Sequence, residues 1–197
     1  LVARLARLPV ELSMTTNGAV LSRLAGPLKQ AGLHRVTISC DSLRPERFAS
    51  ITGRDQLEPV LRGIEAAQAA GLHPVKLNAV LMRGINDDEV LDLARFGRDR
   101  GVVVRFIEFM PLDGAGEWSS DRVVPASEIV ERINAAFPLE AAAARGNQPA
   151  ERYRYLDGAG EVGVVASVTR PFCGNCDRVR LTAEGELRAC LFAVRER

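Results

Sequence analysis

The chain has 197 residues, of which 47% are hydrophobic, so it can bury a substantial core as one domain with a small appendage. Its 26 Lys and Arg and 25 Asp and Glu residues give a net charge of +1, which argues against a protein that mainly coats nucleic acid or anionic membrane. The sequence contains no apolar run of about 18 residues, so we expect no transmembrane helix. Pro9 and Glu11 interrupt any secretory signal at the start, and we expect a cytoplasmic protein.

Four β-rich runs follow one another along the first part of the chain, at residues 10–16, 35–42, 74–82 and 102–110. The last three each follow a glycine that ends a helix, namely Gly32, Gly71 and Gly101. Apolar residues at helical spacing predict helices over 57–64 and 90–94, the second capped by Asn86 or Asp87 with Glu89 in its first turn. This alternation predicts an α/β fold with a parallel sheet, either half of a (β/α)8 barrel or part of a doubly wound sheet.

The pattern changes after residue 138. Gly146, Asn147 and Pro149 interrupt an alanine-rich run, so residues 139–150 predict a linker. Two hairpins follow, which turn at residues 157–158 and 184–185. We therefore expect a partial barrel over 1–138, a linker over 139–150 and a small antiparallel domain over 151–197 that carries the cysteines.

Polar side chains gather where the predicted strands end, the edge at which parallel α/β folds bind ligands. They are Thr15, Thr16, Asn17, Ser39, Asp41, Ser42, Lys76, Asn78, Arg105, Glu108 and Met110. The two histidines, His34 and His73, precede their strands and fall at the opposite edge, so they are poor candidates for a role at the same site.

Each polar residue at this edge also has a structural interpretation. The Thr, Ser and Asn residues serve equally well as helix caps and turns. Lys76 is harder to explain in that way, because a buried charge needs a partner or a ligand. Arg105 and Glu108 raise the same question, and they could pair with each other or with Lys76.

Three of the four cysteines, Cys173, Cys176 and Cys190, form a C-x2-C motif followed after thirteen residues by one more cysteine. Zinc is the usual metal for C-x2-C, but it needs a fourth ligand, and the adjacent Asp177 is awkwardly placed. An iron–sulfur cluster tolerates three cysteines and leaves one iron open. Both chemistries remain open from the spacing alone. We expect Cys40, which lies within a strand, to be a core residue.

Arg178 and Arg180 lie two residues apart after the C-x2-C motif, so on a strand both point to one face. Two guanidinium groups beside a metal with an open position suit an anionic ligand such as a triphosphate. The alternative is an ordinary solvated basic face.

The sequence resembles the GTP 3',8-cyclase family, the radical S-adenosylmethionine enzymes that catalyse the first step of molybdenum cofactor biosynthesis. The segments that carry the resemblance are SMTTNG, VTISCDSLRPERFASITGRD, VKLNAVLMRGINDDE, RFIEFMPLD and SVTRPFCGNCDRVRLTAEGELRACLFA. The resemblance implies an incomplete (β/α) barrel, closed at its lower end by a small C-terminal domain that binds a cluster.

The resemblance also implies the site residues. Cys173, Cys176 and Cys190 match the three ligands of the family's second [4Fe–4S] cluster, whose open iron binds the guanine of GTP. The positions that contact GTP correspond to Thr15, Lys76, Arg178, Val179 and Arg180. Ser39 and Met110 match positions that line the S-adenosylmethionine site, and Arg105 lies in the same motif as Met110 with its role left open.

In the family, reductive cleavage of S-adenosylmethionine at a first [4Fe–4S] cluster gives a 5'-deoxyadenosyl radical. That radical takes hydrogen from C3' of GTP, and the new carbon radical attacks C8, which leads to (8S)-3',8-cyclo-7,8-dihydroguanosine 5'-triphosphate. The partner implied downstream is cyclic pyranopterin monophosphate synthase. We expect no nucleic-acid or membrane partner, and a homodimer is left open.

The sequence lacks three family features: the C-x3-C-x2-C motif of the first cluster, the Gly-rich S-adenosylmethionine motif and the C-terminal Gly-Gly tail. We therefore expect a fragment of a longer enzyme that is inactive alone. Two alternatives remain. Another radical enzyme with an auxiliary cluster would not form these products from GTP. A non-catalytic zinc module that contacts nucleic acid through Arg178, Arg180 and Arg188 would be colourless, with salt-sensitive binding.

Overall fold

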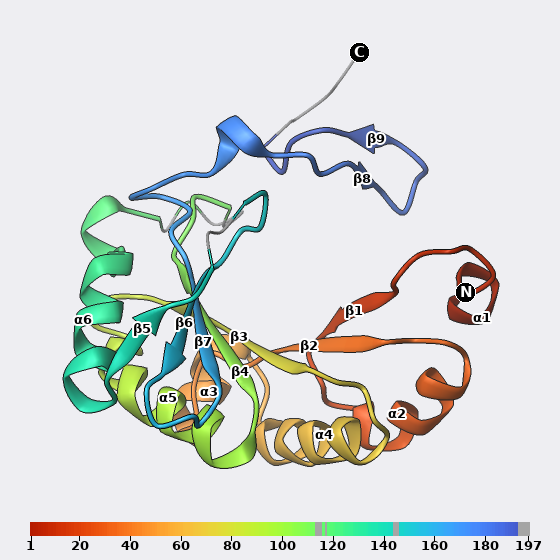
Figure 1. Ribbon diagram of the computed structural model, residues 1–197, viewed down its shortest axis with the longest axis horizontal. Coiled ribbons are helices and arrows are strands. Elements are labelled where there is room, and N and C mark those ends of the chain that lie inside the picture. The colour runs from red at the N-terminus through yellow and green to blue at the C-terminus, as the bar shows by residue number, and fades with distance from the viewer. Residues whose placement is uncertain (113–115, 117, 144–145, 193–197) are drawn as a thin grey trace.

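The computed structural model describes residues 1–112, 116, 118–143 and 146–192 (Figure 1). Its helices are α1 (Val2–Leu5), α2 (Leu21–Gln30), α3 (Pro45–Thr52), α4 (Leu57–Ala69), α5 (Val90–Arg100) and α6 (Ala126–Ala136), with short 3-10 turns at Asp87–Glu89, Ser120–Arg122 and Cys173–Asn175. Its strands are β1 (Ser13–Thr16), β2 (Arg35–Ser39), β3 (Val75–Leu81), β4 (Val103–Glu108), β5 (Leu139–Ala141), β6 (Glu151–Tyr155), β7 (Glu161–Val165), β8 (Arg180–Leu181) and β9 (Leu187–Arg188).

Seven strands form one mixed sheet in the order β1-β2-β3-β4-β7-β6-β5. The pairs β1–β2, β2–β3, β3–β4 and β4–β7 are parallel, and β6 is antiparallel to β7. The four predicted runs therefore form parallel strands. Gly32, Gly71 and Gly101 all have positive φ just past their helices, the conformation that only glycine adopts at low cost. An α/β fold built from βαβ units is confirmed.

The first predicted hairpin belongs to the main sheet rather than to the cysteine-bearing appendage. It turns at Gly158, as expected, but β7 pairs along β4, and the predicted linker supplies β5 at its start. Its placement on a separate appendage is wrong, because β7 completes the row of parallel strands that β4 would otherwise leave exposed. The division into domains at 139 and 151 stays a prediction.

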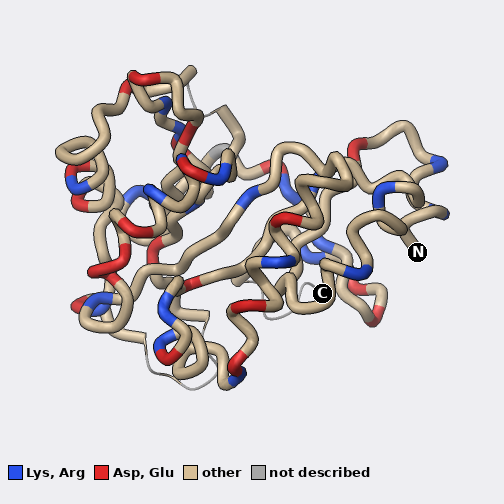
Figure 2. Tube along the Cα trace, turned by 90° about the horizontal axis from the view of Figure 1, so that it is seen from below, with Lys and Arg blue, Asp and Glu red and all other residues tan. Residues whose placement is uncertain are grey.

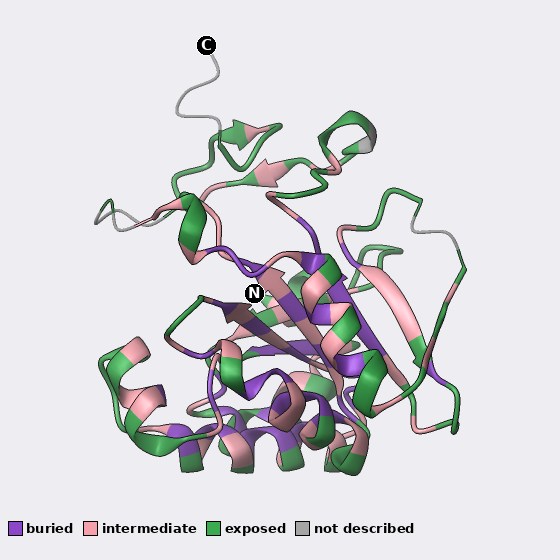
Figure 3. Ribbon diagram, turned by 90° about the vertical axis from the view of Figure 1, so that its left-hand side faces the viewer, coloured by how far each residue is buried: buried purple, intermediate pink, exposed green. Residues whose placement is uncertain are grey.

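The sheet has two different faces because side chains alternate along each strand. On β3, Val75, Leu77, Ala79 and Leu81 are buried in one apolar cluster with residues of α2, α4 and α5. Lys76, Asn78 and Val80 are half-buried on the opposite side, which we call the inner face. Figures 1 and 3 show the helices from α2 to α6 on one side of the sheet and the segment with β8 and β9 on the other.

The loop before α5 is built differently from the prediction. Neither Asn86 nor Asp87 caps the helix through its side chain; Asn86 is buried and donates to the carbonyls of Asp41 and Val80. Glu89 is fully buried and accepts hydrogen bonds from the Ser42 hydroxyl and the Leu43 amide, at 2.6 and 2.7 Å. The predicted cap is wrong because these side chains tie the loops after β2 and β3 together.

Charged residues of both signs are interspersed over the molecule, in keeping with the net charge of +1 (Figure 2). Within the described residues, no helix has the length and apolar character required to cross a membrane.

Candidate functional site

The register of the parallel strands places six polar residues in two rows on the inner face. Thr15, Thr37 and Lys76 lie opposite one another on β1, β2 and β3. Asn78 on β3 faces Arg105 on β4 in the next row, which begins at Ser39. Side chains opposite one another in adjacent strands share a face, so the sheet brings Thr15, Ser39, Lys76 and Arg105 together on one surface.

Arg105 is held in place by neutral groups. Its Nε donates to Asn78 Oδ1 at 2.9 Å, and its Nη2 donates to Thr37 Oγ1 at 3.3 Å. Burial lowers the pKa of the Arg105 guanidinium, and the nearby Arg35 lowers it further. Of the alternatives left open by the sequence, pairing of Arg105 with Glu108 is wrong, because the two residues lie on opposite faces of β4.

Lys76 lies among like charges. Burial lowers the pKa of its ammonium group, and Arg105 and Arg35 lower it further, while Glu161 offsets part of the effect. Within the described part of the chain, Lys76 forms no ion pair within 4.0 Å. Two cations that share a half-buried surface without a carboxylate in contact create a favourable potential for an anionic ligand.

The position of Lys76 along its strand corrects the sequence interpretation. Lys76 is the second residue of β3, and Arg105 is the third of β4, so neither lies at the carboxyl edge of the sheet. They meet through the alternation of side chains across the sheet rather than through the ends of their strands. Met110, two residues after β4, and Ser39, the last residue of β2, do lie at the carboxyl edge.

The carboxyl edge of β1 and β2 carries a small pocket of about 190 Å³, lined in part by Asn17, Ser39 and Asp41. Asn17 serves as a turn residue, one of its two structural interpretations, with its Oδ1 accepting from the Ala19 amide. Asp41 accepts a hydrogen bond from the Val80 amide at 2.7 Å, and burial raises the pKa of its carboxyl group. Asp41 therefore holds β3 beside the pocket instead of reaching out from it.

Cys40 is buried, as predicted, with 1% of its surface exposed. Burial raises the pKa of its thiol to about 12. A thiol in that environment stays protonated and behaves as a small apolar side chain, so Cys40 is a core residue.

The other three cysteines are exposed on the C-terminal segment. Cys173 and Cys176 flank a 3-10 turn, with the Cys176 amide 3.2 Å from the Cys173 carbonyl oxygen. Cys190 follows β9, and β8 pairs with β9 as predicted. Among the described residues, no three Cys, His, Asp or Glu side chains are arranged to hold a metal ion. The three thiols thus lie on one short segment of the chain, but they are not arranged as ligands of one metal ion.

The donor chemistry of this segment nevertheless fits an iron–sulfur cluster. The backbone and side chain of Arg178 lower the pKa of the Cys176 thiol, and the Arg178 guanidinium lies 3.2 Å from its sulfur. Thiolates are the usual ligands of such clusters. Asp177, the residue considered as a fourth zinc ligand, accepts an exposed hydrogen bond from the Asn147 side chain at 3.0 Å.

Basic residues line the hairpin beside the cysteines. Arg180 faces Arg188 directly across β8 and β9, and the guanidinium carbon of Arg178 lies 4.7 Å from the Phe172 ring centroid. Val179 lies between the two predicted arginines and is 68% exposed. The segment therefore offers cations close to its thiols.

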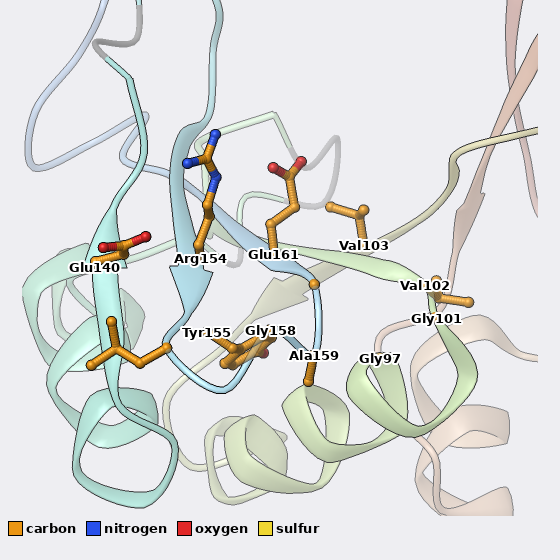
Figure 4. A pocket seen from close by; sticks show the side chains of 12 residues that line it. Gly97, Gly101, Val102, Val103, Glu140, Arg154, Tyr155, Gly158, Ala159 and Glu161 are labelled. Carbon is orange, nitrogen blue, oxygen red and sulfur yellow. The ribbon is translucent and has the colours of Figure 1, made fainter.

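A pocket of about 510 Å³ lies away from these residues, at the amino edge of β4 and β7 (Figure 4). Glu140, Arg154 and Glu161 extend from its walls, with Tyr155 and the turn at Gly158 nearby. His34, which accepts a hydrogen bond from the Leu12 amide, and His73 also precede their strands, so both stand apart from the carboxyl edge as expected.

Two inner-face residues were not predicted. Thr37 accepts a hydrogen bond from Arg105, and Gly163 on β7 lies opposite Arg105. A Cβ on Gly163 would lie 3.0 Å from the Arg105 Cγ, so the glycine makes room for that side chain. Alternation along RVTIS could have placed Thr37 on the same face as Ser39, but pairing of β7 with β4 has no local signal.

Comparison with known proteins relates the two parts of the chain to two known families. Residues 1–97 match the Radical SAM superfamily, and residues 102–196 match Molybdenum Cofactor Synthesis C. GTP 3',8-cyclases from Acidothermus cellulolyticus, Streptomyces coelicolor and Xanthomonas axonopodis pv. citri are 51%, 50% and 46% identical over 99%, 94% and 98% of this chain.

The chain belongs to the GTP 3',8-cyclase family. It spans 55%, 55% and 59% of the length of those three relatives, little more than half of each. The chain is also similar to a solved structure of TYW1 with a lysine-pyruvate adduct bound, with a TM-score of 0.48 and 13% sequence identity. The match covers 77% of this chain and 46% of the TYW1 chain.

Proposed function

We propose that this chain forms part of a GTP 3',8-cyclase of molybdenum cofactor biosynthesis, a lyase that acts by a 5'-deoxyadenosyl radical. The observation that carries the proposal is the inner face, where Lys76 and Arg105 are half-buried beside each other without a carboxylate in contact. Such a surface fits a polyanion. GTP also carries a guanine that a metal could bind, so this ligand suits both the inner face and residues 166–192, which we call the cysteine segment.

We assign roles to the chain's residues on that basis. Lys76 and Thr15 contact GTP from the sheet, and Arg178, Val179 and Arg180 contact it from the cysteine segment. Ser39 and Met110 at the carboxyl edge line the S-adenosylmethionine site. Arg105, fixed by Asn78 and Thr37, keeps a positive charge beside Lys76 and favours the anion.

Cys173, Cys176 and Cys190 would hold the second [4Fe–4S] cluster, which supplies an iron with an open position for guanine. The chain's own part is to bind and orient GTP, because positioning lowers the entropic cost of the reaction. We place the protein in the cytoplasm, before cyclic pyranopterin monophosphate synthase in the pathway; whether it forms a homodimer stays open.

The first test is anaerobic reconstitution with iron and sulfide, followed by EPR of the reduced protein with and without GTP. We expect a cluster signal that changes when GTP is added. Cys173→Ser, Cys176→Ser and Cys190→Ser should each lower the iron content, whereas the matched control Cys40→Ser should not. An iron signal indifferent to GTP favours another radical enzyme, and bound zinc without iron favours a structural module.

A further inference from the structure

Glu108, the last residue of β4, joins the main sheet to the segment that leads into the cysteine motif. Its side chain is fully buried, yet the hydrogen bonds that its carboxylate accepts from the described residues all come from outside the sheet. Oε2 accepts from the amides of Val168 and Thr169, at 2.7 and 2.8 Å. Oε1 accepts from the Thr169 hydroxyl at 2.5 Å and from the amide of Ala126, the first residue of α6, at 2.8 Å.

These contacts reach both halves of the proposed site. Glu108 is three residues from Arg105 and two from Met110, and Thr169 is four residues before Cys173. The Ser167 hydroxyl also donates to the Glu108 carbonyl oxygen at 3.3 Å. Other links between this segment and the preceding chain include Arg170 with Glu151 and Asn147 with Asp177, which are exposed and therefore weaker.

We propose that Glu108 is a positioning residue that fixes the cysteine segment relative to the inner face. The inference rests on the proposed function, in which GTP contacts Lys76 on the sheet and Arg178 on the segment at once. A ligand that bridges two parts binds tightly only when their separation is fixed beforehand, since otherwise binding must order them.

A carboxylate is required here because four donors converge on two oxygens. Glu108→Gln keeps the size of the side chain but replaces one acceptor oxygen with an NH2 group, which would face donors. At least one buried donor then loses its partner, a costly change. We expect the segment to come loose from β4 while its thiols, which are local to the segment, still bind iron.

The test compares the reconstituted 197-residue chain with Glu108→Gln and with Glu89→Gln. Glu89 is an equally buried carboxylate that accepts from backbone and side-chain donors, but its partners lie in the loop after β2 and, in the case of Arg47, on α3. It therefore controls for general loss of stability. Iron content, GTP affinity by anaerobic titration, and amide hydrogen exchange are measured for each protein.

We expect Glu108→Gln to keep its iron, to bind GTP at least 10-fold more weakly, and to exchange the amides of residues 166–172 at least 10-fold faster, with α4 unchanged. Glu89→Gln should keep its GTP affinity within 2-fold. The proposal is overturned if Glu108→Gln retains GTP affinity, or if both variants lose it alike. If Glu108→Gln fails to fold, Thr169→Val is used instead, because it removes one of the four donors. Unchanged amide hydrogen exchange and unchanged GTP affinity in Thr169→Val would overturn the proposal.

Failure of the proposed function would look different. If the unaltered chain binds no GTP, the assignment of GTP is wrong. Hydrogen exchange still judges the positioning role, and unchanged exchange at residues 166–172 in Glu108→Gln overturns it.

Discussion

Arg98 on α5 holds three elements together at the amino edge of the sheet, and its removal tests the packing there. Its guanidinium carbon lies 4.5 Å from the ring centroids of both Phe137 and Tyr155, and it forms an ion pair with Asp157 at 2.5 Å. The Arg98 side chain is 16% exposed. We predict that Arg98→Ala lowers the free energy of unfolding by about 2 kcal/mol.

The magnitude follows from these contacts. An arginine over an aromatic ring contributes roughly 0.5–1 kcal/mol when exposed and about 2 kcal/mol when desolvated. The two rings on a mostly covered arginine therefore contribute about 1 kcal/mol each. Asp157 is exposed, so solvent screens the ion pair, and we expect it to add little. Loss of the packed alkyl stem adds to the effect.

Urea unfolding followed by circular dichroism measures the change. The matched control is Arg62→Ala, which removes an exposed pair with Glu58 one helical turn away, at 3.1 Å. That pair should contribute about 0.3 kcal/mol. The reasoning is refuted if Arg98→Ala costs no more than Arg62→Ala, or if Asp157→Asn costs as much as Arg98→Ala.

Three further predictions concern the inner face and its support. Lys76→Met should weaken GTP binding yet stabilise the free chain. Because the pKa of Lys76 is lowered in the folded state, the free energy of unfolding of the unaltered chain should rise with pH just below the ordinary lysine pKa of 10.5. Urea titrations at a series of pH values should show this rise in the unaltered chain and not in the variant. Gly163→Ala should displace Arg105 and cost about 1 kcal/mol in urea unfolding, and an unchanged GTP affinity would contradict the role given to Arg105. Glu89→Ala should cost about 3 kcal/mol in the same assay, because Arg47 and two other donors lose a buried partner; a loss under 1 kcal/mol would contradict this.

The parallel part of the sheet could be predicted because its signals are local. β2, β3 and β4 are each preceded by a glycine whose positive φ follows the end of a helix, as Gly71 does before β3. The alternation in VKLNAVL also separates a buried face from the face that carries Lys76 and Asn78. Such patterns depend on neighbours in sequence, which is all that a sequence displays.

The pairing of β7 with β4 could not be predicted in this way. A hairpin turn at Gly158 indicates that β6 and β7 pair with each other, but not which edge of another sheet they join. For the same reason, the contacts of Glu108 were invisible, since its partners at 168 and 169 are about 60 residues away in the chain. The sequence marked Glu108 as a charge that needs a partner, but neither of the two partners it suggested, Arg105 and Lys76, is the one in the structure.

The same limit explains why the cationic character of the site emerges only from the register. Arg180 lies directly opposite Arg188, and like charges in that position destabilise a strand pair, an effect that the ion pair of Arg188 with Glu186 offsets in part. Lys76 and Arg105 repeat the conflict on the inner face. The net charge of +1 conceals both clusters, because it averages over the whole surface. Each part of the proposed site thus contains two neighbouring positive charges that repel each other. Such repulsion is expected where a protein gives up stability in order to bind an anion, as we propose for GTP.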